Sequence, residues 1–294
     1  MNQFKTAALL GLLSALLITI SYGVIGGAAG VIFGIGLAAI SNLGAWYCSD
    51  RIALAAYRAQ PVSLYQAPRL HQIVARLAQR ANIPVPQVYI IPGQAANAFA
   101  TGRDPEHAAI AVTEGILNLL PDAELEGVLA HELSHILNRD TLTQAVAATI
   151  AGAISFLAQI LSFSLWFGGG RSSDDANPLG IFATVLFAPL AATVIQLGIS
   201  RTREFAADAG AAQLTGNPRA LAQALQRLEA SAQRRPLAGN PAFAPLLIVN
   251  AVPKLGLNSL FSTHPSTQDR IQRLLQLEQT QLSTVNWRGM MGRA

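Results

Sequence analysis

Four long apolar runs constrain the fold of this chain more than any other feature of its sequence. Two open the chain, at Thr6–Ile25 and Val31–Tyr47, and two lie mid-chain, at Thr143–Phe167 and Leu179–Ser200. A helix needs about 20 apolar residues to cross a hydrocarbon core of ~30 Å. We therefore expect a membrane protein with four hydrophobic helices, the first two forming an uncleaved hairpin rather than a signal peptide.

The two mid-chain runs are less uniform than the first pair. Gln159, Pro189 and Gln196 interrupt them, so a buried helical hairpin is the alternative to full crossing. The link GGGRSSDDANP at 168–178 is typical of an exposed loop. Only 12% of the residues are charged, against about 25% in an ordinary soluble domain. Because this deficit is concentrated in the runs, it indicates membrane segments rather than a uniformly apolar fold.

The basic residues near the ends of the runs predict an orientation. If all four runs cross, one side carries only Arg171, beside Asp174 and Asp175. The other side carries Lys5, Arg51, Arg58, Arg139, Arg201 and Arg203. Lysine and arginine are enriched on the cytoplasmic flanks of membrane helices. We therefore expect both termini and the polar segments to lie in the cytoplasm.

The polar segments have the patterns of a mixed helical and β domain. An amphipathic helix is predicted near Pro68–Ala81, short strands around 87–92, 98–101 and 108–113, and a further helix from about Pro121. The expected division is a transmembrane hairpin at 1–50, a first catalytic part at 51–142, a second hydrophobic hairpin at 143–200, a second catalytic part at 201–285 and a tail at 286–294.

The motif HELSH at 131–135 carries the chemistry that the sequence predicts. His131 and His135 are four residues apart, so on a helix they share one face and can share a tetrahedral ion. Glu132 lies beside the first histidine, where its carboxylate can take a proton from a water that zinc activates. The spacing alone also arises by chance, so the interpretation depends on a third ligand.

EFAAD at 204–208 supplies that ligand. Glu204 completes a site of two histidines and one glutamate, and Asp208, one turn later, is placed to fix the tautomer of a ligand histidine. The alternative is that Glu204 and Asp208 bind no metal and lie on a solvated helix face, beside Arg201 and Arg203. Two apolar runs separate HELSH from Glu204, and an even number of crossings returns the chain to the same side of the membrane.

Composition argues against a nucleic-acid-binding site and against sites built from cysteine. The formal net charge is +4, with no long run of like charges and no aromatic residues interleaved with basic ones, so nucleic-acid binding is not expected. The excess of positive charge suits contact with an anionic lipid bilayer. Cys48 is the one cysteine, which excludes an intrachain disulfide and a thiolate zinc site.

HELSH, a hydrophobic hairpin and then SRTREFAADAGA make the chain resemble the HtpX-type membrane zinc metalloproteases, bacterial relatives of the CAAX prenyl proteases. NAFATGR at 97–103 and FSTHPSTQDRI at 261–271 are similar to that family too. The resemblance implies a membrane α+β protein: four hydrophobic helices with a gluzincin-like, mostly helical domain and a small β-sheet. It implies a catalytic domain that faces the cytoplasm at the bacterial inner membrane and cleaves membrane or misfolded proteins in quality control.

The resemblance also implies roles for further residues. His264 would help to hold the oxyanion of the transition state, and Asn97, Ala98, Phe99 and Ala100 would form part of an edge strand that pairs with the substrate backbone. Without the resemblance, His264 is part of a turn before a helix at Ser266–Glu278, and the segment from Asn97 is a plain hairpin strand.

The predicted function is a zinc endopeptidase with one Zn²⁺ per chain, bound by His131, His135 and Glu204, and with Glu132 as general base. Its partners would be membrane-protein or unfolded polypeptide substrates and the lipid bilayer, and a homo-oligomer is left open. The alternative is a non-catalytic membrane scaffold with a vestigial zinc site. Proteolysis inside the bilayer is excluded by the charges around HELSH, among them Glu124, Glu126, Arg139 and Asp140.

Overall fold

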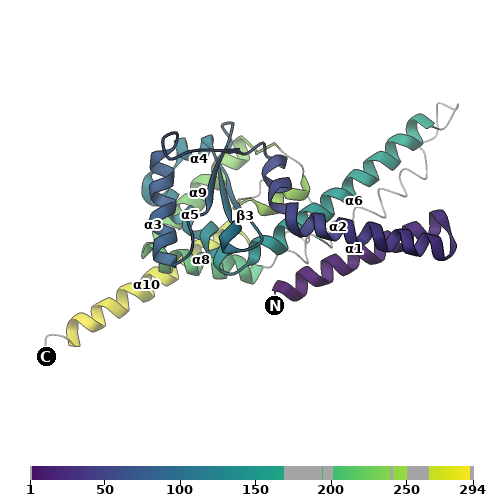
Figure 1. The fold of residues 1–294 in the computed structure, drawn as a ribbon. Coiled ribbons are helices and arrows are strands. Elements are labelled where there is room, and N and C mark those ends of the chain that lie inside the picture. Colours follow the sequence, from purple (N-terminus) through teal and green to yellow (C-terminus); the bar gives the residue numbers. More distant parts are fainter. Residues whose placement is uncertain (1, 169–193, 195–200, 239–240, 250–264, 292–294) are drawn as a thin grey trace.

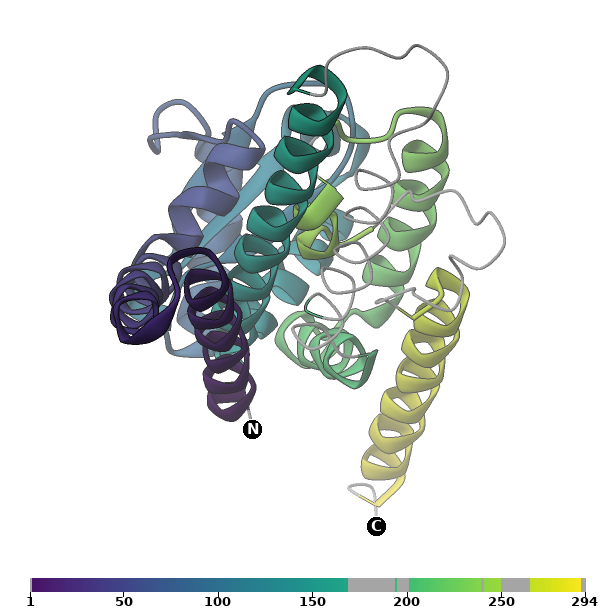
Figure 2. The same cartoon turned by 90° about the vertical axis from the view of Figure 1, so that its right-hand side faces the viewer.

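In the computed structural model, a bundle of long helices projects from a domain of mixed helices and strands (Figures 1 and 2). It describes residues 2–168, 194, 201–238, 241–249 and 265–291. The domain holds a small sheet with helices around it. The long helices α1, α2 and α6 extend together from one side of the domain, and α10 extends from the other (Figure 1).

The first two apolar runs form a helical hairpin, as predicted. Helix α1 (Asn2–Ile25) and helix α2 (Gly27–Ala56) meet at Gly26, whose φ of +79° is in the left-handed region that glycine adopts readily. Among the described residues, α2 is the one helix long and apolar enough to cross a membrane, and Phe4–Thr19 is a shorter apolar stretch. The outer face of α2 leaves Ile32 and Ile40 about 70% exposed, which suits contact with lipid.

The third run lies in helix α6 (Asp140–Gly168), which begins inside the protein. Its residues 140–148 are all buried, and α1, α2 and the 3₁₀ turn η2 (Pro241–Leu246) pack against it. The hydroxyls of Thr6 and Thr143 are hydrogen-bonded at 2.8 Å, which joins α1 to α6. The fourth predicted run, Leu179–Ser200, lies outside the described residues except for Val194, so four hydrophobic helices remain a prediction.

The sheet has four strands in the order β1-β2-β4-β3. Its strands are β1 (Gln60–Pro61), β2 (Gln87–Ile91), β3 (Ala98–Thr101) and β4 (Ala109–Thr113). The central strands β2 and β4 are parallel, whereas β3 runs antiparallel to β4 at one edge of the sheet, with Ala98 opposite Val112. The sequence predicted β2, β3 and β4 correctly, but not the two-residue strand β1.

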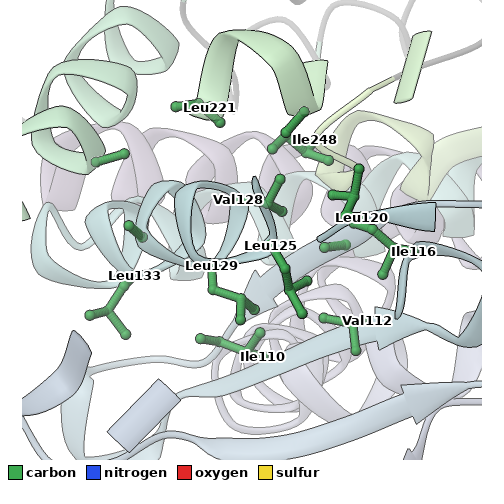
Figure 3. Packing of buried hydrophobic residues seen from close by; sticks show 14 of the residues in the cluster. Ile110, Val112, Ile116, Leu120, Leu125, Val128, Leu129, Leu133, Leu221 and Ile248 are labelled. Atoms are coloured by element: carbon green, nitrogen blue, oxygen red, sulfur yellow. The ribbon is translucent and has the colours of Figure 1, made fainter. Parts of the chain in front are cut away.

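Helices surround the sheet, and the apolar faces of α3, α5, α8 and α9 pack with it in one core cluster (Figure 3). A second cluster joins the sheet to α1, α2 and α6. Helix α3 (Pro68–Ala81) has the predicted bounds and buries Leu70, Ile73, Val74 and Leu77, the i, i+3, i+4, i+7 spacing of an amphipathic helix. The other elements are η1 (Pro105–His107), α4 (Glu114–Leu119), α5 (Asp122–Leu137), α8 (Arg201–Thr215), α9 (Pro218–Arg234) and α10 (Thr267–Met291). The helix α10 is longer than predicted and continues into the expected tail at 286–294.

Helix α5 lies at the centre of the domain. It contacts α3, α8, α9 and β3, and every residue from Gly127 to Ile136 is buried. Pro121 precedes its first turn as the N-cap residue, and Asp122 and Glu124 lie at the positive end of its dipole. A helix buried on all sides has few places for polar groups, so the polar residues that α5 carries need partners from its neighbours.

Candidate metal centre

The two histidines of HELSH lie on the same face of α5, within its buried stretch from Gly127 to Ile136. Their rings are nearly perpendicular, with centroids 4.8 Å apart, and their Nε2 atoms are separated by 3.2 Å. Both side chains are almost fully buried, with at most 5% of either residue exposed. The helical spacing predicted this shared face.

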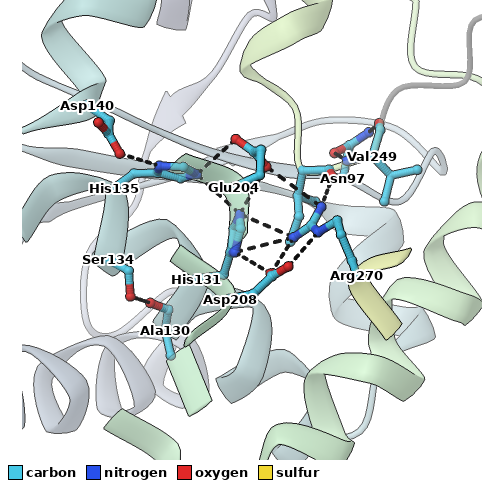
Figure 4. A network of polar contacts seen from close by, with 11 residues as sticks. Asn97, Ala130, His131, Ser134, His135, Asp140, Glu204, Asp208, Val249 and Arg270 are labelled. Atoms are coloured by element: carbon cyan, nitrogen blue, oxygen red, sulfur yellow. Dashed lines mark hydrogen bonds and ion pairs between the residues drawn. The ribbon is translucent and has the colours of Figure 1, made fainter. Parts of the chain in front are cut away.

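Helix α8 brings Glu204 to the same point, as predicted (Figure 4). Oε2 of Glu204 lies 3.7 Å from Nε2 of His131, and Oε1 lies 3.5 Å from Nε2 of His135. One ligand atom from each of the three residues lies within 4.8 Å of the others. Glu204 is separated from HELSH by the whole hydrophobic segment, so folding creates this cluster.

The three side chains converge closely enough to share one metal ion. Two atoms that are each about 2.0–2.1 Å from a tetrahedral Zn²⁺ lie roughly 3.3–3.4 Å apart. The two Nε2 atoms are 3.2 Å apart, and each lies 3.5–3.7 Å from a different oxygen of Glu204. With one atom taken from each residue, all separations are within 4.8 Å, so a bound ion would draw the carboxylate closer. Two imidazoles and one carboxylate are also the donor set of catalytic zinc sites that keep a fourth position for water.

The outward-facing Nδ1 atoms of both histidines contact carboxylates. Nδ1 of His131 lies 2.9 Å from Oδ1 of Asp208, one turn after Glu204 on α8. Nδ1 of His135 lies 3.1 Å from Oδ2 of Asp140, the first residue of α6. Such a carboxylate fixes the tautomer of a histidine, so that the other ring nitrogen presents its lone pair to a metal.

Two arginines lie beside these carboxylates. Arg270 on α10 pairs with Asp208 at 2.7 Å, and Arg203 on α8 lies 3.4 Å from Asp140. Sequence reasoning predicted Asp208 but missed Asp140 and Arg270 as parts of the site. Arg270 belongs to the FSTHPSTQDRI motif, and Asp140 follows His135 by five residues, but neither position has a spacing that indicates a ligand partner.

The buried carboxylates favour positive charge at His131. Burial and the neighbouring Arg270 act to lower the pKa of His131, but hydrogen bonds to Asp208 and Glu204 outweigh them and raise it to about 9. Burial acts to raise the pKa of Asp208, but Arg270 and His131 lower it to about 2. The site therefore stabilises a cation between its side chains, either a proton on His131 or a metal ion that displaces it.

Glu132 lies between the histidines and the sheet. It is 2% exposed and accepts a hydrogen bond from the backbone N–H of Ala100 on β3. Burial raises the pKa of Glu132 more than the two nearby histidines lower it. A carboxylate with a raised pKa, held beside the candidate metal site, has the properties of a general base.

The segment from Asn97 to Ala100 forms the edge of the sheet next to the metal centre. This edge is partly occupied, because the N–H of Ile248 donates to the carbonyl of Ala98 at 3.1 Å. The side-chain amide of Asn97 donates to the carbonyl of Val249 at 2.8 Å. The predicted pairing of this edge with substrate is not tested by these contacts, but the edge is less open than an unpaired strand. His264 lies outside the described residues.

Close packing of α5 against α8 holds the ligands together. A Cβ atom added to Gly210 on α8 would lie 2.6 Å from Oγ of Ser134 on α5, and 3.0 Å from its Cβ. Gly210 therefore permits the approach that brings Glu204 to the histidines.

We expect Gly210→Ala to separate the two helices slightly and to lower the free energy of unfolding by about 1–3 kcal/mol, the usual cost of overpacking. Thermal unfolding with and without zinc measures this effect. Ser134→Ala, which removes the nearest atom, should restore part of the loss in the double variant. Equal stability of Gly210→Ala and the unaltered protein would show that the contact does not control the helix spacing.

Comparison with known proteins identifies the family. The sequence profile of Peptidase family M48 matches residues 65–278, which include every residue of the metal centre. A Protease HtpX homolog of Trichormus variabilis is 70% identical over 287 residues, covering 97% of this chain and 99% of that protein. The chain belongs to the HtpX-type proteases of family M48.

Other similarities agree with this family. A Protease HtpX homolog of Pyrococcus furiosus is 48% identical over 272 residues, with 92% of this chain and 94% of that protein covered. The crystal structure of S. mikatae Ste24p is similar with a TM-score of 0.50 and 21% identity, covering 90% of this chain and 62% of that protein. The structural similarity extends the shared fold beyond the matched profile, into the N-terminal helices.

Proposed function

We propose that this HtpX-type protease is a zinc-dependent endopeptidase in which His131, His135 and Glu204 hold one Zn²⁺. The observation that carries the proposal is the arrangement of the two histidines: both Nε2 atoms face Glu204, and both Nδ1 atoms contact a carboxylate. Membership of a peptidase family supports the reaction type. The His-His-Glu cluster supports the metal.

The balance of buried charge also supports a divalent cation. Four carboxylates are buried around the two histidines, those of Glu132, Asp140, Glu204 and Asp208. Two buried guanidinium groups oppose them, those of Arg203 and Arg270. Ionised, these described groups carry a formal charge of two negative units, and buried charge is costly unless it is compensated. A divalent cation bound by the histidines and Glu204 would neutralise it.

Each residue of the site would have its own role in peptide-bond hydrolysis. Zn²⁺, when bound, polarises the scissile carbonyl and lowers the pKa of a water toward ~7. Glu132 takes the proton of the attacking water and later passes it to the leaving amine. The N–H of Ala100 fixes the Glu132 carboxylate for this exchange, while Asp208 and Asp140 keep the two imidazoles in one tautomer. His264 is proposed, from the family pattern, to stabilise the oxyanion.

The substrate class is proposed from the position of the site relative to the long helices. Asp140 is both the partner of His135 and the first residue of α6, so the centre lies where the hydrophobic helices join the domain. We propose membrane proteins and unfolded polypeptides as substrates, in quality control at the bacterial inner membrane, with the catalytic domain in the cytoplasm. The edge strand from Asn97 to Ala100 would bind the substrate main chain.

Casein hydrolysis separates this function from a non-catalytic scaffold with a vestigial zinc site. The purified protein in detergent should contain about one Zn²⁺ per chain and should cleave casein. Treatment with a chelator should abolish the cleavage, and added Zn²⁺ should restore it, because the metal supplies the activated water. A protein that binds Zn²⁺ but leaves both casein and unfolded membrane-protein substrates intact would support the scaffold instead.

A further inference from the structure

Arg270 is one of the most deeply buried charged residues that the structure describes. It lies at the start of α10 and is 2% exposed. Arginine is rarely buried to this extent unless its charge and its N–H donors are matched. The groups that contact Arg270 therefore indicate its role in the structure.

The guanidinium group donates two hydrogen bonds to the carboxylate of Asp208. Its Nε donates to Oδ2 at 2.9 Å, and its Nη2 donates to Oδ1 at 2.7 Å. This bidentate arrangement fixes the plane of the carboxylate as well as its position. The same Oδ1 atom contacts Nδ1 of His131 at 2.9 Å. Nη2 also lies 3.3 Å from Nδ1 and 3.4 Å from Nε2 of His131, and Nη1 lies 3.8 Å from Oε2 of Glu204. The two shortest bonds of the guanidinium go to Asp208, so Arg270 acts on His131 mainly through this carboxylate.

The remaining nitrogen of the guanidinium points to the edge of the sheet. Nη1 donates to the carbonyl of Ile248 at 3.0 Å, and the N–H of the same residue donates to Ala98 on β3. The next residue, Val249, is held by the side chain of Asn97. One side chain on α10 therefore contacts both the carboxylate behind a predicted zinc ligand and the strip of chain at 248–249 that lies along β3 (Figure 4).

We propose that Arg270 is a positioning residue that fixes Asp208 behind His131 and holds the strip 248–249 against β3, so that the metal centre and the peptide-binding edge form one unit. The proposal rests on the proposed zinc protease function. Lysine cannot replace Arg270, because a single ammonium group does not form the bidentate pair and reach Ile248 together. The role differs from that of a catalytic residue, since Arg270 acts through its neighbours.

Zinc affinity in a double-mutant cycle tests the first part. Arg270→Lys in the full-length protein should weaken zinc binding by about 10–100-fold, the range for partners behind a metal ligand, as measured by chelator competition. In an Asp208→Asn background the same change should weaken binding by less than about threefold, because the carboxylate that transmits the effect has been altered. Arg219→Lys is the matched control, since Arg219 forms a bidentate pair between α9 and α10 with Glu278, on the surface.

Hydrogen exchange tests the second part. The amide of Ile248 should exchange at least about tenfold faster in Arg270→Lys than in the unaltered protein, whereas amides in α3 should not change. Additive losses of zinc affinity in the cycle would overturn the proposal, and so would loss of zinc that only parallels a general loss of folded protein. If the unaltered protein bound no zinc, the proposed function would fail, whereas normal zinc binding by Arg270→Lys would refute only the role of Arg270.

Discussion

Replacing Glu132 with glutamine is expected to abolish peptide hydrolysis while the protein keeps its zinc. Glutamine has nearly the same shape and retains an oxygen that can accept the N–H of Ala100, so the local structure should persist. It has no basic carboxylate, so the attacking water keeps its proton. We expect turnover to fall by at least the 10²–10⁴-fold typical of a lost general base, measured on casein at matched zinc content.

The same variant separates the chain's own activity from contamination. Any fragments that the unaltered protein produces from itself during purification should be absent from Glu132→Gln. Fragmentation of both proteins at the same rate would indicate a contaminating protease. Turnover within a few-fold of the unaltered protein, at the same zinc content, would contradict the role of Glu132 as base.

Replacing Glu204 with alanine is expected to remove most of the bound zinc, and hydrolysis with it. The change leaves two protein ligands, and alanine offers no donor in place of the carboxylate that lies 3.5–3.7 Å from both Nε2 atoms. The loss of affinity should exceed the 10–100-fold expected for Asp208→Asn, because Asp208 contacts a ligand rather than the ion. Zinc content after dialysis, with affinity from chelator competition, provides the measurement.

Glu278→Ala is the matched control for this substitution. Glu278 is also a helical glutamate in an ion pair, but its partner Arg219 is mostly exposed and the pair lies on the surface, away from the histidines. This variant should keep its zinc. Full zinc retention by Glu204→Ala would remove Glu204 from the site, and the cluster would then require a different third ligand.

Local patterns predicted the elements that local physics controls. Short apolar runs located three of the four strands, and the amphipathic pattern located α3 from Pro68 to Ala81. The spacing of His131 and His135 fixed their shared face, since four residues on a helix return to nearly the same direction. The pairing of HELSH with Glu204 was predicted from EFAAD and from the two apolar runs between the motifs, and the resemblance to a known family implied the same ligand.

The parts that the sequence did not predict depend on contacts between distant segments. Asp208 meets Arg270 across 62 positions, and Asn97 meets Val249 across 152. No periodicity indicates such pairs. The strip at 248–249 was not predicted to lie along β3. Its contacts use main-chain N–H and C=O groups, which every residue type carries, so no residue pattern indicates them. The number of hydrophobic helices also remains a prediction, since the fourth run lies outside the described residues.

The junction between α5 and α6 has a practical consequence for handling this protein. Asp140 holds His135 and also begins the long apolar helix whose first turns pack against α1 and α2. A detergent that loosens these three helices is therefore expected to displace a partner of the candidate zinc centre. The zinc content of a preparation would then report how well the extraction has preserved the helix bundle. Under the proposed function, a sample that is monodisperse but poor in metal would indicate damage in that bundle.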